Sequence, residues 1–98
     1  MLWAIYLTDK PDATALRAKH LEPHKAYLHK VDSQIFFTGP LQSDDATKNI
    51  GSLWIINAGS RAEAQAFSDG EAYTRAGVFS SVTITRARKD ILHPELAD

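Results

Sequence analysis

Four short apolar segments, separated by stretches of different spacing, set the pattern of this chain. Residues 1–8 carry apolar, β-branched and aromatic side chains on both alternating faces, which is typical of an interior strand covered on two sides. Residues 51–58 are apolar enough to form a second interior strand, and residues 34–38 predict a further strand. Residues 78–85 alternate apolar and polar positions, as a half-buried strand does. The pattern therefore predicts four β-strands.

Two of the intervening segments carry apolar residues at helical intervals. The first covers residues 13–31 and contains Pro23, which lacks a backbone N–H, so we expect a kink there or a split after Glu22. The second begins after Ser60, the first residue of a Ser-Arg-Ala-Glu capping-box pattern, and ends near Gly70. The chain is thus expected to contain two helices.

The remaining segments are typical of turns and connectors. Gly39-Pro40 is expected to end the second strand, because proline cannot donate to a β-ladder and glycine favours a turn. The polar residues 41–49 predict a hairpin loop, residues 71–77 predict a connector, and residues 86–98 predict a charged tail.

The order β-α-β-β-α-β predicts an α+β protein with a ferredoxin-like fold, in which a four-stranded antiparallel sheet carries two helices on one face. Apolar side chains also occupy the other face of the predicted strands, so something must cover that face. A second copy of the chain is the simplest cover, and we therefore expect a homodimer that forms through the open sheet face. Residues 1–98 would form one domain, in which residues 88–98 are a C-terminal tail.

Composition and charge exclude several classes of protein. The 98 residues are 44% hydrophobic and 23% charged, which suits one globular domain. A formal net charge of -1 offers no basic surface for nucleic acid or an anionic membrane. The absence of cysteine excludes disulfides, thiolate nucleophiles and cysteine-based zinc sites. No apolar run approaches the roughly 18 residues of a membrane span, and residues 1–8 lack the basic start of a signal peptide, so we expect a cytoplasmic protein.

Several side chains that are suited to proton transfer or metal binding lie in the first predicted helix. His20 and His24 are four residues apart, so on a helix they share roughly one face. Arg17 and Tyr27 fall on the same face, three residues before and after this pair. Histidine suits proton transfer because its unperturbed pKa lies nearest neutrality. The two histidines could instead bind a metal, but the chain has no His-Glu-x-x-His pattern and Pro23 disrupts the spacing, so we expect no metal site.

Five different short motifs follow one another along the chain. They are Met1-Leu2-Trp3-Ala4-Ile5, His24-Lys25-Ala26-Tyr27-Leu28, Phe37-Thr38-Gly39-Pro40-Leu41, Gly51-Ser52-Leu53 and Glu71-Ala72-Tyr73-Thr74-Arg75-Ala76-Gly77-Val78-Phe79. In this order and spacing, from Met1 to about Arg88, the chain resembles the YciI-like (YCII-related) family. The resemblance implies a ferredoxin-like α+β fold, usually dimeric with sheets face to face, akin to the dimeric α+β barrel proteins. It also implies a small enzyme with a His–Asp active site, and at least one relative acts as a dehydrochlorinase in aromatic degradation.

The resemblance also implies which residues form the catalytic pair. The family histidine corresponds to His24, because Tyr27-Leu28 follow it as in the family motif. Many relatives carry Asp-Pro ahead of a Tyr or Phe late in the chain. Here Glu71-Ala72 occupies those positions and Asp69 lies two residues earlier, so either Glu71 or Asp69 is expected to be the acidic partner of His24. A carboxylate in that place fixes the imidazole tautomer and stabilises its charged form.

Further residues are candidates for contact with a substrate. Arg17 and Arg75 could hold a carboxylate through their planar guanidinium groups, with a surface ion pair as the alternative for either one. Ser52 could donate a hydrogen bond into a pocket, and since no Gly-x-Ser-x-Gly elbow surrounds it, a nucleophilic serine is excluded. Tyr73 could line the pocket, with core packing as the alternative, and His20 could contact the ligand.

The function that we expect is a small dimeric enzyme that needs no cofactor. It would be a lyase, an isomerase or a dehydrochlorinase that acts on an organic acid or a ring-derived metabolite by proton transfer. His24 would move the proton and Glu71 or Asp69 would orient the ring. The alternatives are a non-catalytic dimeric binding or accessory module that uses the same cleft, and a purely structural protein with no pocket.

Overall fold

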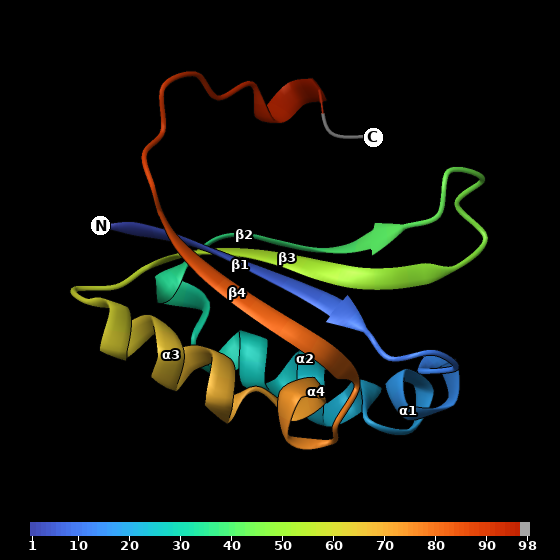
Figure 1. Cartoon of the computed structure of the whole chain (residues 1–98). Coiled ribbons are helices and arrows are strands. Elements are labelled where there is room, and N and C mark those ends of the chain that lie inside the picture. Colours follow the sequence, from blue (N-terminus) through green and yellow to red (C-terminus); the bar gives the residue numbers. More distant parts are fainter. Residues whose placement is uncertain (97–98) are drawn as a thin grey trace.

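A four-stranded antiparallel sheet with its α-helices on one face forms the core of the computed structural model, which describes residues 1–96 (Figure 1). Along the sheet the order is β2-β3-β1-β4. The strands are β1 Leu2–Asp9, β2 Ile35–Gln42, β3 Asn49–Asn57 and β4 Phe79–Ala87. The two strands predicted to be interior, β1 and β3, occupy the centre of the sheet, and the βαββαβ order of the ferredoxin-like fold is confirmed.

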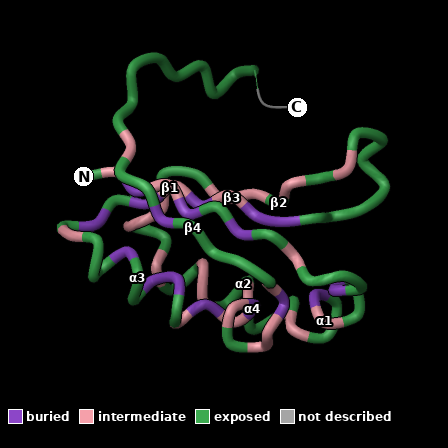
Figure 2. Tube along the Cα trace, in the orientation of Figure 1, coloured by how far each residue is buried: buried purple, intermediate pink, exposed green. Residues whose placement is uncertain are grey.

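The hydrophobic core lies between the sheet and the helices. Trp3, Ile5 and Leu7 alternate along β1 and are buried on the helix side, where Trp54 of β3 packs with them. On the opposite side Tyr6 is 53% exposed. Figure 2 shows buried positions on the central strands and on α3. The expectation that β1 is covered on both faces is therefore not met within one chain, because every α-helix of residues 1–96 lies on the first face.

The first predicted helix is split into α1, Thr14–Lys19, and α2, Leu21–Lys30. The break falls at His20, so the predicted kink at Pro23 or split after Glu22 is wrong. Pro23 lies instead in the first turn of α2, where backbone N–H groups have no partner within the helix. Its ring would collide with the carbonyl of Lys19 in a continuous helix, and α1 ends at that residue.

The second predicted helix is α3, Arg61–Gly70, and its capping box is confirmed. Ser60 Oγ accepts the Glu63 N–H at 3.2 Å, and Glu63 Oε2 accepts the Gly59 N–H at 2.7 Å. The following segment, predicted as a connector, contains the single-turn helix α4, Ala72–Arg75. A helix of four residues has no apolar period that a sequence pattern could reveal.

Strand β2 runs through Gly39-Pro40 to Gln42, so the predicted end of the strand at these two residues is wrong. The physical reason is that β2 lies at the edge of the sheet, where a residue without an N–H can be accommodated. The turn that joins β2 to β3 is consequently shorter than the predicted loop and covers residues 43–48.

Asp45 organises this turn. Its Oδ1 accepts hydrogen bonds from Ser43 Oγ at 2.8 Å, from Thr47 N at 3.1 Å and from Thr47 Oγ1 at 2.7 Å. These hydrogen bonds, led by the one from the Thr47 side chain, lower the pKa of Asp45.

A short 3₁₀ helix, η1 Asp32–Gln34, joins α2 to β2, and a second, η2 Pro94–Leu96, follows β4 after an irregular stretch. The predicted tail thus leaves the sheet after Ala87 and lies on the side opposite the α-helices (Figure 1), while its last two positions, 97–98, fall outside the described residues. No helix among residues 1–96 is long and apolar enough to cross a membrane.

Candidate functional site

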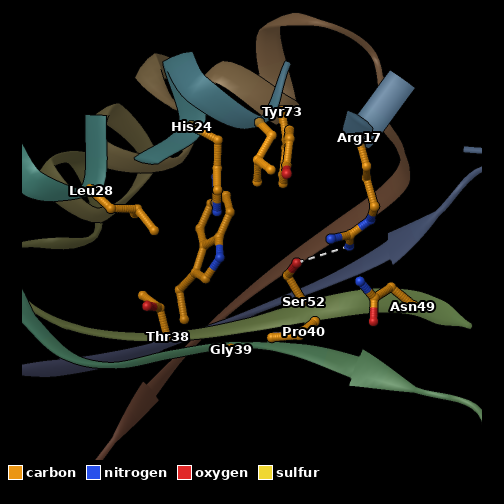
Figure 3. Close-up of a pocket in the computed structure, with 11 residues that line it drawn as sticks. Arg17, His24, Leu28, Thr38, Gly39, Pro40, Asn49, Ser52 and Tyr73 are labelled. Atoms are coloured by element: carbon orange, nitrogen blue, oxygen red, sulfur yellow. Dashed lines mark hydrogen bonds between the residues drawn. The ribbon is translucent and has the colours of Figure 1, made fainter. Parts of the chain in front are cut away.

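A cavity of about 250 Å³ lies between the helices α1, α2 and α4 and the edge of the sheet formed by β2 and β3 (Figure 3). Polar and apolar side chains share its wall, which consists of Arg17, Leu21, His24, Leu28, Thr38, Gly39, Pro40, Asn49, Ser52, Trp54 and Tyr73. His24 and Tyr73 enter from the helices, and Thr38, Pro40 and Ser52 enter from the strands, so both layers of the fold contribute to the site.

His24 lines this cavity and pairs with the fully buried Glu71. His24 Nδ1 lies 2.5 Å from Glu71 Oε1, and the side chains are 17% and 0% exposed, respectively. Glu71 caps α4, because its Oε2 accepts the backbone N–H of Tyr73 at 2.8 Å and that of Thr74 at 3.4 Å. Both carboxylate oxygens are thereby held in place. With Nδ1 occupied, Nε2 is the ring nitrogen that remains for a molecule in the cavity.

Tyr73 fixes the plane of the His24 ring. The two rings stack with centroids 4.0 Å apart and an interplanar angle of 8°. Burial raises the pKa of the Tyr73 hydroxyl above its ordinary value; the charge of Arg17 lowers it, and the carboxylates of Glu71 and Asp9 raise it. Tyr73 is therefore a neutral phenol at physiological pH and can donate a hydrogen bond into the cavity.

Arg17, from the last turn of α1, is a buried cation with four hydrogen bonds. Its Nε and Nη2 donate to the carboxylate of Asp9 at 2.7 and 2.9 Å. Nη2 also donates to Gly51 O at 2.8 Å and to Ser52 Oγ at 3.1 Å. Within the described residues 1–96, Arg17 donates only through Nε and Nη2, so its Nη1 is left for a ligand. Ser52 accepts from Arg17 with its lone pair, so its hydroxyl hydrogen is available to the cavity.

The structure brings five of the predicted site residues together, namely Arg17, His24, Ser52, Glu71 and Tyr73. The other three predicted site residues, His20, Asp69 and Arg75, lie outside the wall of the cavity. Asp69 is exposed on α3 and accepts a hydrogen bond from Gln65 Nε2 at 2.9 Å, so of the two acids that the sequence left open, Glu71 is the one that contacts His24. Arg75 is exposed at the end of α4 and lies outside the cavity wall, contrary to the expectation of a substrate contact.

His20 also lies outside the cavity wall, at the junction between α1 and α2. The structure therefore does not place His20 with the residues that line the cavity, and its contact with a ligand stays a prediction. Within residues 1–96 no group of three or more His, Cys, Asp or Glu side chains could hold a metal ion.

Several residues of the site were missed by sequence reasoning. Asp9 was not among the predicted site residues, although an acid at the end of an apolar strand is a usable signal for a buried ion pair with a nearby arginine. Asn49 falls in the predicted hairpin loop and Trp54 falls in a predicted strand, so neither was marked as a site residue. Thr38 belongs to the motif Phe37-Thr38-Gly39-Pro40-Leu41, and that motif was the signal that could have marked it as a site residue.

Comparisons with known proteins identify the family of the chain. The YCII-related domain matches residues 1–88. Protein YciI from Escherichia coli O6:H1 (strain CFT073) and Protein YciI from Shigella flexneri are each 30% identical to the chain over 96 residues, which covers 91% of this chain and 98% of theirs.

Among solved structures, the chain is similar to 5-chloro-2-hydroxyhydroquinone dehydrochlorinase (TftG) from Burkholderia phenoliruptrix AC1100 in complex with 2,5-dihydroxybenzoquinone. The TM-score is 0.83 at 29% sequence identity, and the match covers 92% of this chain and 96% of that chain. The domain match and the relatives together show that the chain belongs to the YCII-related family.

Proposed function

We propose that this chain is a small-molecule enzyme in which His24 transfers a proton to or from a substrate bound in the cavity. The observation that carries the proposal is that His24, which lines a cavity of ligand size, contacts the fully buried carboxylate of Glu71 through Nδ1. Such a reaction needs no cofactor, because the proton moves between the imidazole and the substrate. The reaction class is a lyase, an isomerase or a dehydrochlorinase.

The division of labour within the pair follows from its geometry. The carboxylate of Glu71 accepts a hydrogen bond from Nδ1–H of His24. The neutral ring therefore keeps its proton on Nδ1, and the lone pair of Nε2 is free to act as a base. When Nε2 takes up a proton, the charged ring lies beside a carboxylate that stabilises it. Glu71 is a positioning residue in this proposal, and His24 is the catalytic residue.

The wall of the cavity indicates a small, flat substrate that carries oxygen atoms. Leu21, Leu28 and Trp54 supply apolar surface, while Arg17, Ser52 and Tyr73 supply hydrogen-bond donors. An organic acid or a hydroxylated ring fits this combination. The likeness to a dehydrochlorinase that binds 2,5-dihydroxybenzoquinone supports the ring-derived class.

The open face of the sheet supports a homodimer as the working form. Tyr6 is 53% exposed and Phe37 is 48% exposed on this face, and Leu53 and Ile55 lie beside them in the β-ladder. Apolar side chains gathered on one face of a sheet favour association with a self-complementary surface. A second copy of the chain, packed sheet against sheet, would bury them.

A comparison of two histidine variants on the same helix tests the function. His24→Gln should abolish turnover in a screen of lactones, halogenated enols and hydroxylated halogenated rings, whereas His29→Gln, at an exposed position of α2, should keep it. Circular dichroism would verify that both variants fold. An activity that survives His24→Gln undiminished would refute the proton-transfer role. Ligand binding without any turnover in the wild type would favour the non-catalytic binding module instead.

A further inference from the structure

A second and larger hollow adjoins the cavity. It has a volume of about 620 Å³ and shares four wall residues with the cavity, which are Arg17, Leu21, Asn49 and Tyr73. In Figure 3 Arg17 and Asn49 mark the end of the cavity that lies farthest from Leu28. The two spaces meet at these side chains, so a molecule whose ring fills the cavity can extend an arm past them into the hollow.

The floor and one side of this hollow belong to the turn between β2 and β3. Ala46, Thr47 and Lys48 line it from the turn, Gln42 and Asn49 line it from the adjoining strand ends, and Thr14 and Ala18 line it from α1. The Asp45 hydrogen bonds fix the conformation of the turn. The backbone of Lys48 is anchored as well, since its N–H donates to Ser43 Oγ at 3.2 Å and its carbonyl accepts the Ser43 N–H at 3.0 Å.

The charge in this hollow is positive. Its wall contains Arg17 and Lys48 and no carboxylate. Asp9 neutralises Arg17, so Lys48 supplies the excess charge. None of the ion pairs formed within residues 1–96 involves Lys48. Three acids lie around Lys48: Asp45, whose carboxylate is hydrogen-bonded to Ser43 and Thr47 of the same turn, and Asp9 and Asp12, which line a separate hollow together with Lys48.

Neutral donors accompany this lysine. The Asn49 side-chain oxygen accepts from Gln42 Nε2 at 3.4 Å, so the amide N–H groups of Asn49 are left for a ligand. Thr14 lines the same wall and supplies a second neutral donor, its hydroxyl, whereas the Thr47 hydroxyl already donates to Asp45 Oδ1. One cation together with amide and hydroxyl donors matches a single carboxylate, whereas a phosphate group is typically held by several cations or by a row of backbone N–H groups.

We propose that this hollow, which we call the Lys48 groove, binds a carboxylate that the substrate carries on a short arm. The ring of the substrate would occupy the cavity beside His24, and the carboxylate would reach Lys48 and Asn49. The inference rests on the proposed function, because it takes the cavity as the place of the reacting ring. It narrows the substrate class to acids that bear a small hydroxylated ring.

A titration followed by ¹H–¹⁵N NMR tests this groove without any need for turnover. The two probes are 4-hydroxyphenylacetate and its uncharged amide, 4-hydroxyphenylacetamide, which have the same size and differ in charge. We expect the acid to bind the wild type about threefold to fivefold more tightly than the amide, as a solvent-screened ion pair allows. The acid should shift the backbone signals of Thr47 and Asn49 more than the amide does.

Three variants complete the test. Lys48→Gln should reduce the affinity for the acid to that for the amide, and Lys48→Arg should keep the preference. Lys25→Gln changes the same charge at an exposed position of α2 and should leave the preference intact. The inference would be overturned if the two probes bound the wild type with equal affinity, or if neither bound. It would also be overturned if the preference for the acid survived Lys48→Gln, or if the backbone signals of Thr47 and Asn49 did not shift.

The outcome is separable from that of the proposed function. Loss of the acid preference in Lys48→Gln, together with full turnover in His24→Gln, would support the groove and refute the proton-transfer role. Loss of turnover in His24→Gln without any acid preference would support the enzyme and refute the groove.

Discussion

The imidazole of His24 and the carboxylate of Glu71 meet at 2.5 Å, and the second oxygen of that carboxylate accepts the backbone N–H of Tyr73 at 2.8 Å. Glu71 is therefore held at one end by the start of α4, which sets the direction in which its other oxygen points. The position of the proton on His24 depends on a helix of a single turn.

This arrangement predicts the tautomer of His24. In the wild type the neutral ring should carry its proton on Nδ1, which donates to Glu71, and should have a bare Nε2. In Glu71→Gln the amide oxygen should stay on the Tyr73 N–H, so the amide NH₂ group would face Nδ1 and the proton would move to Nε2. The ¹⁵N chemical shifts of the ring, recorded at a pH where it is neutral, distinguish the two tautomers. The same tautomer in both proteins would contradict this geometry.

Arg17 is predicted to stabilise the fold strongly. Arg17→Met leaves the carboxylate of Asp9, which is 6% exposed, without its bidentate partner, and it also removes the hydrogen bond to Gly51 O. Breaking a buried ion pair from one side typically costs about 3–5 kcal/mol of unfolding free energy. Urea denaturation measures this loss. Arg88→Met is the matched control, because its ion pair with Asp90 is 85% and 76% exposed and should contribute little. Similar losses in both variants would contradict the prediction.

Tyr27 is predicted to make the fold sensitive to alkaline pH. Its hydroxyl donates to Phe67 O at 2.9 Å, and burial, followed by the charge of Glu71, raises the pKa of Tyr27 above 10.0. Above about pH 10 the unfolded chain therefore releases a proton that folded Tyr27 retains, so stability falls as pH rises. The contribution is fully present below pH 10 and is lost as pH rises through the folded-state pKa.

Tyr27→Phe removes the titrating hydroxyl group, so the unfolding free energy of the variant should fall less steeply than that of the wild type between about pH 10 and pH 11. Part of the decline should remain, because the pKa of Tyr73 is raised as well. At neutral pH the variant should lose about 1 kcal/mol with the hydrogen bond to Phe67 O. Thermal unfolding across this pH range gives the answer. A decline as steep as that of the wild type would show that Tyr27 titrates normally.

The open sheet face predicts a dimer in solution. Sedimentation velocity should find the wild type as a dimer, and Tyr6→Lys or Phe37→Lys should shift it to the monomer at the same concentration, since each places a charge on the apolar face. Ala66→Lys, on the exposed side of α3, adds the same charge elsewhere and should leave the dimer intact. A monomeric wild type would contradict the homodimer.

The sequence predicted the order of the large elements because their signals are local. The alternation in residues 78–85 and the capping box at Ser60 depend only on neighbouring residues. The end of β2 could not be predicted in this way, because Gly39-Pro40 is compatible with a strand only at the edge of a sheet. That position is set by pairing with β3, which is distant in the sequence.

The same limit applies to the site. His24 was predictable from its motif, but the choice between Asp69 and Glu71 depended on α4. Glu71 points back into the molecule because it caps this helix, whereas Asp69 lies on the solvent side of α3. Likewise Arg17 and Arg75 look alike in sequence, and only the buried carboxylate of Asp9 distinguishes them.

The central claim is that His24 and Glu71 act as one unit in proton transfer, and a double-mutant cycle on kcat/KM tests it most directly. For a compound that the wild type turns over, His24→Gln should lower kcat/KM by about 100-fold or more. Adding Glu71→Gln to that variant should lower it no further than about twofold, because a positioning residue has no effect once the group that it positions is gone. Losses that multiply in the double variant, or a kcat/KM that His24→Gln leaves unchanged, would contradict the account.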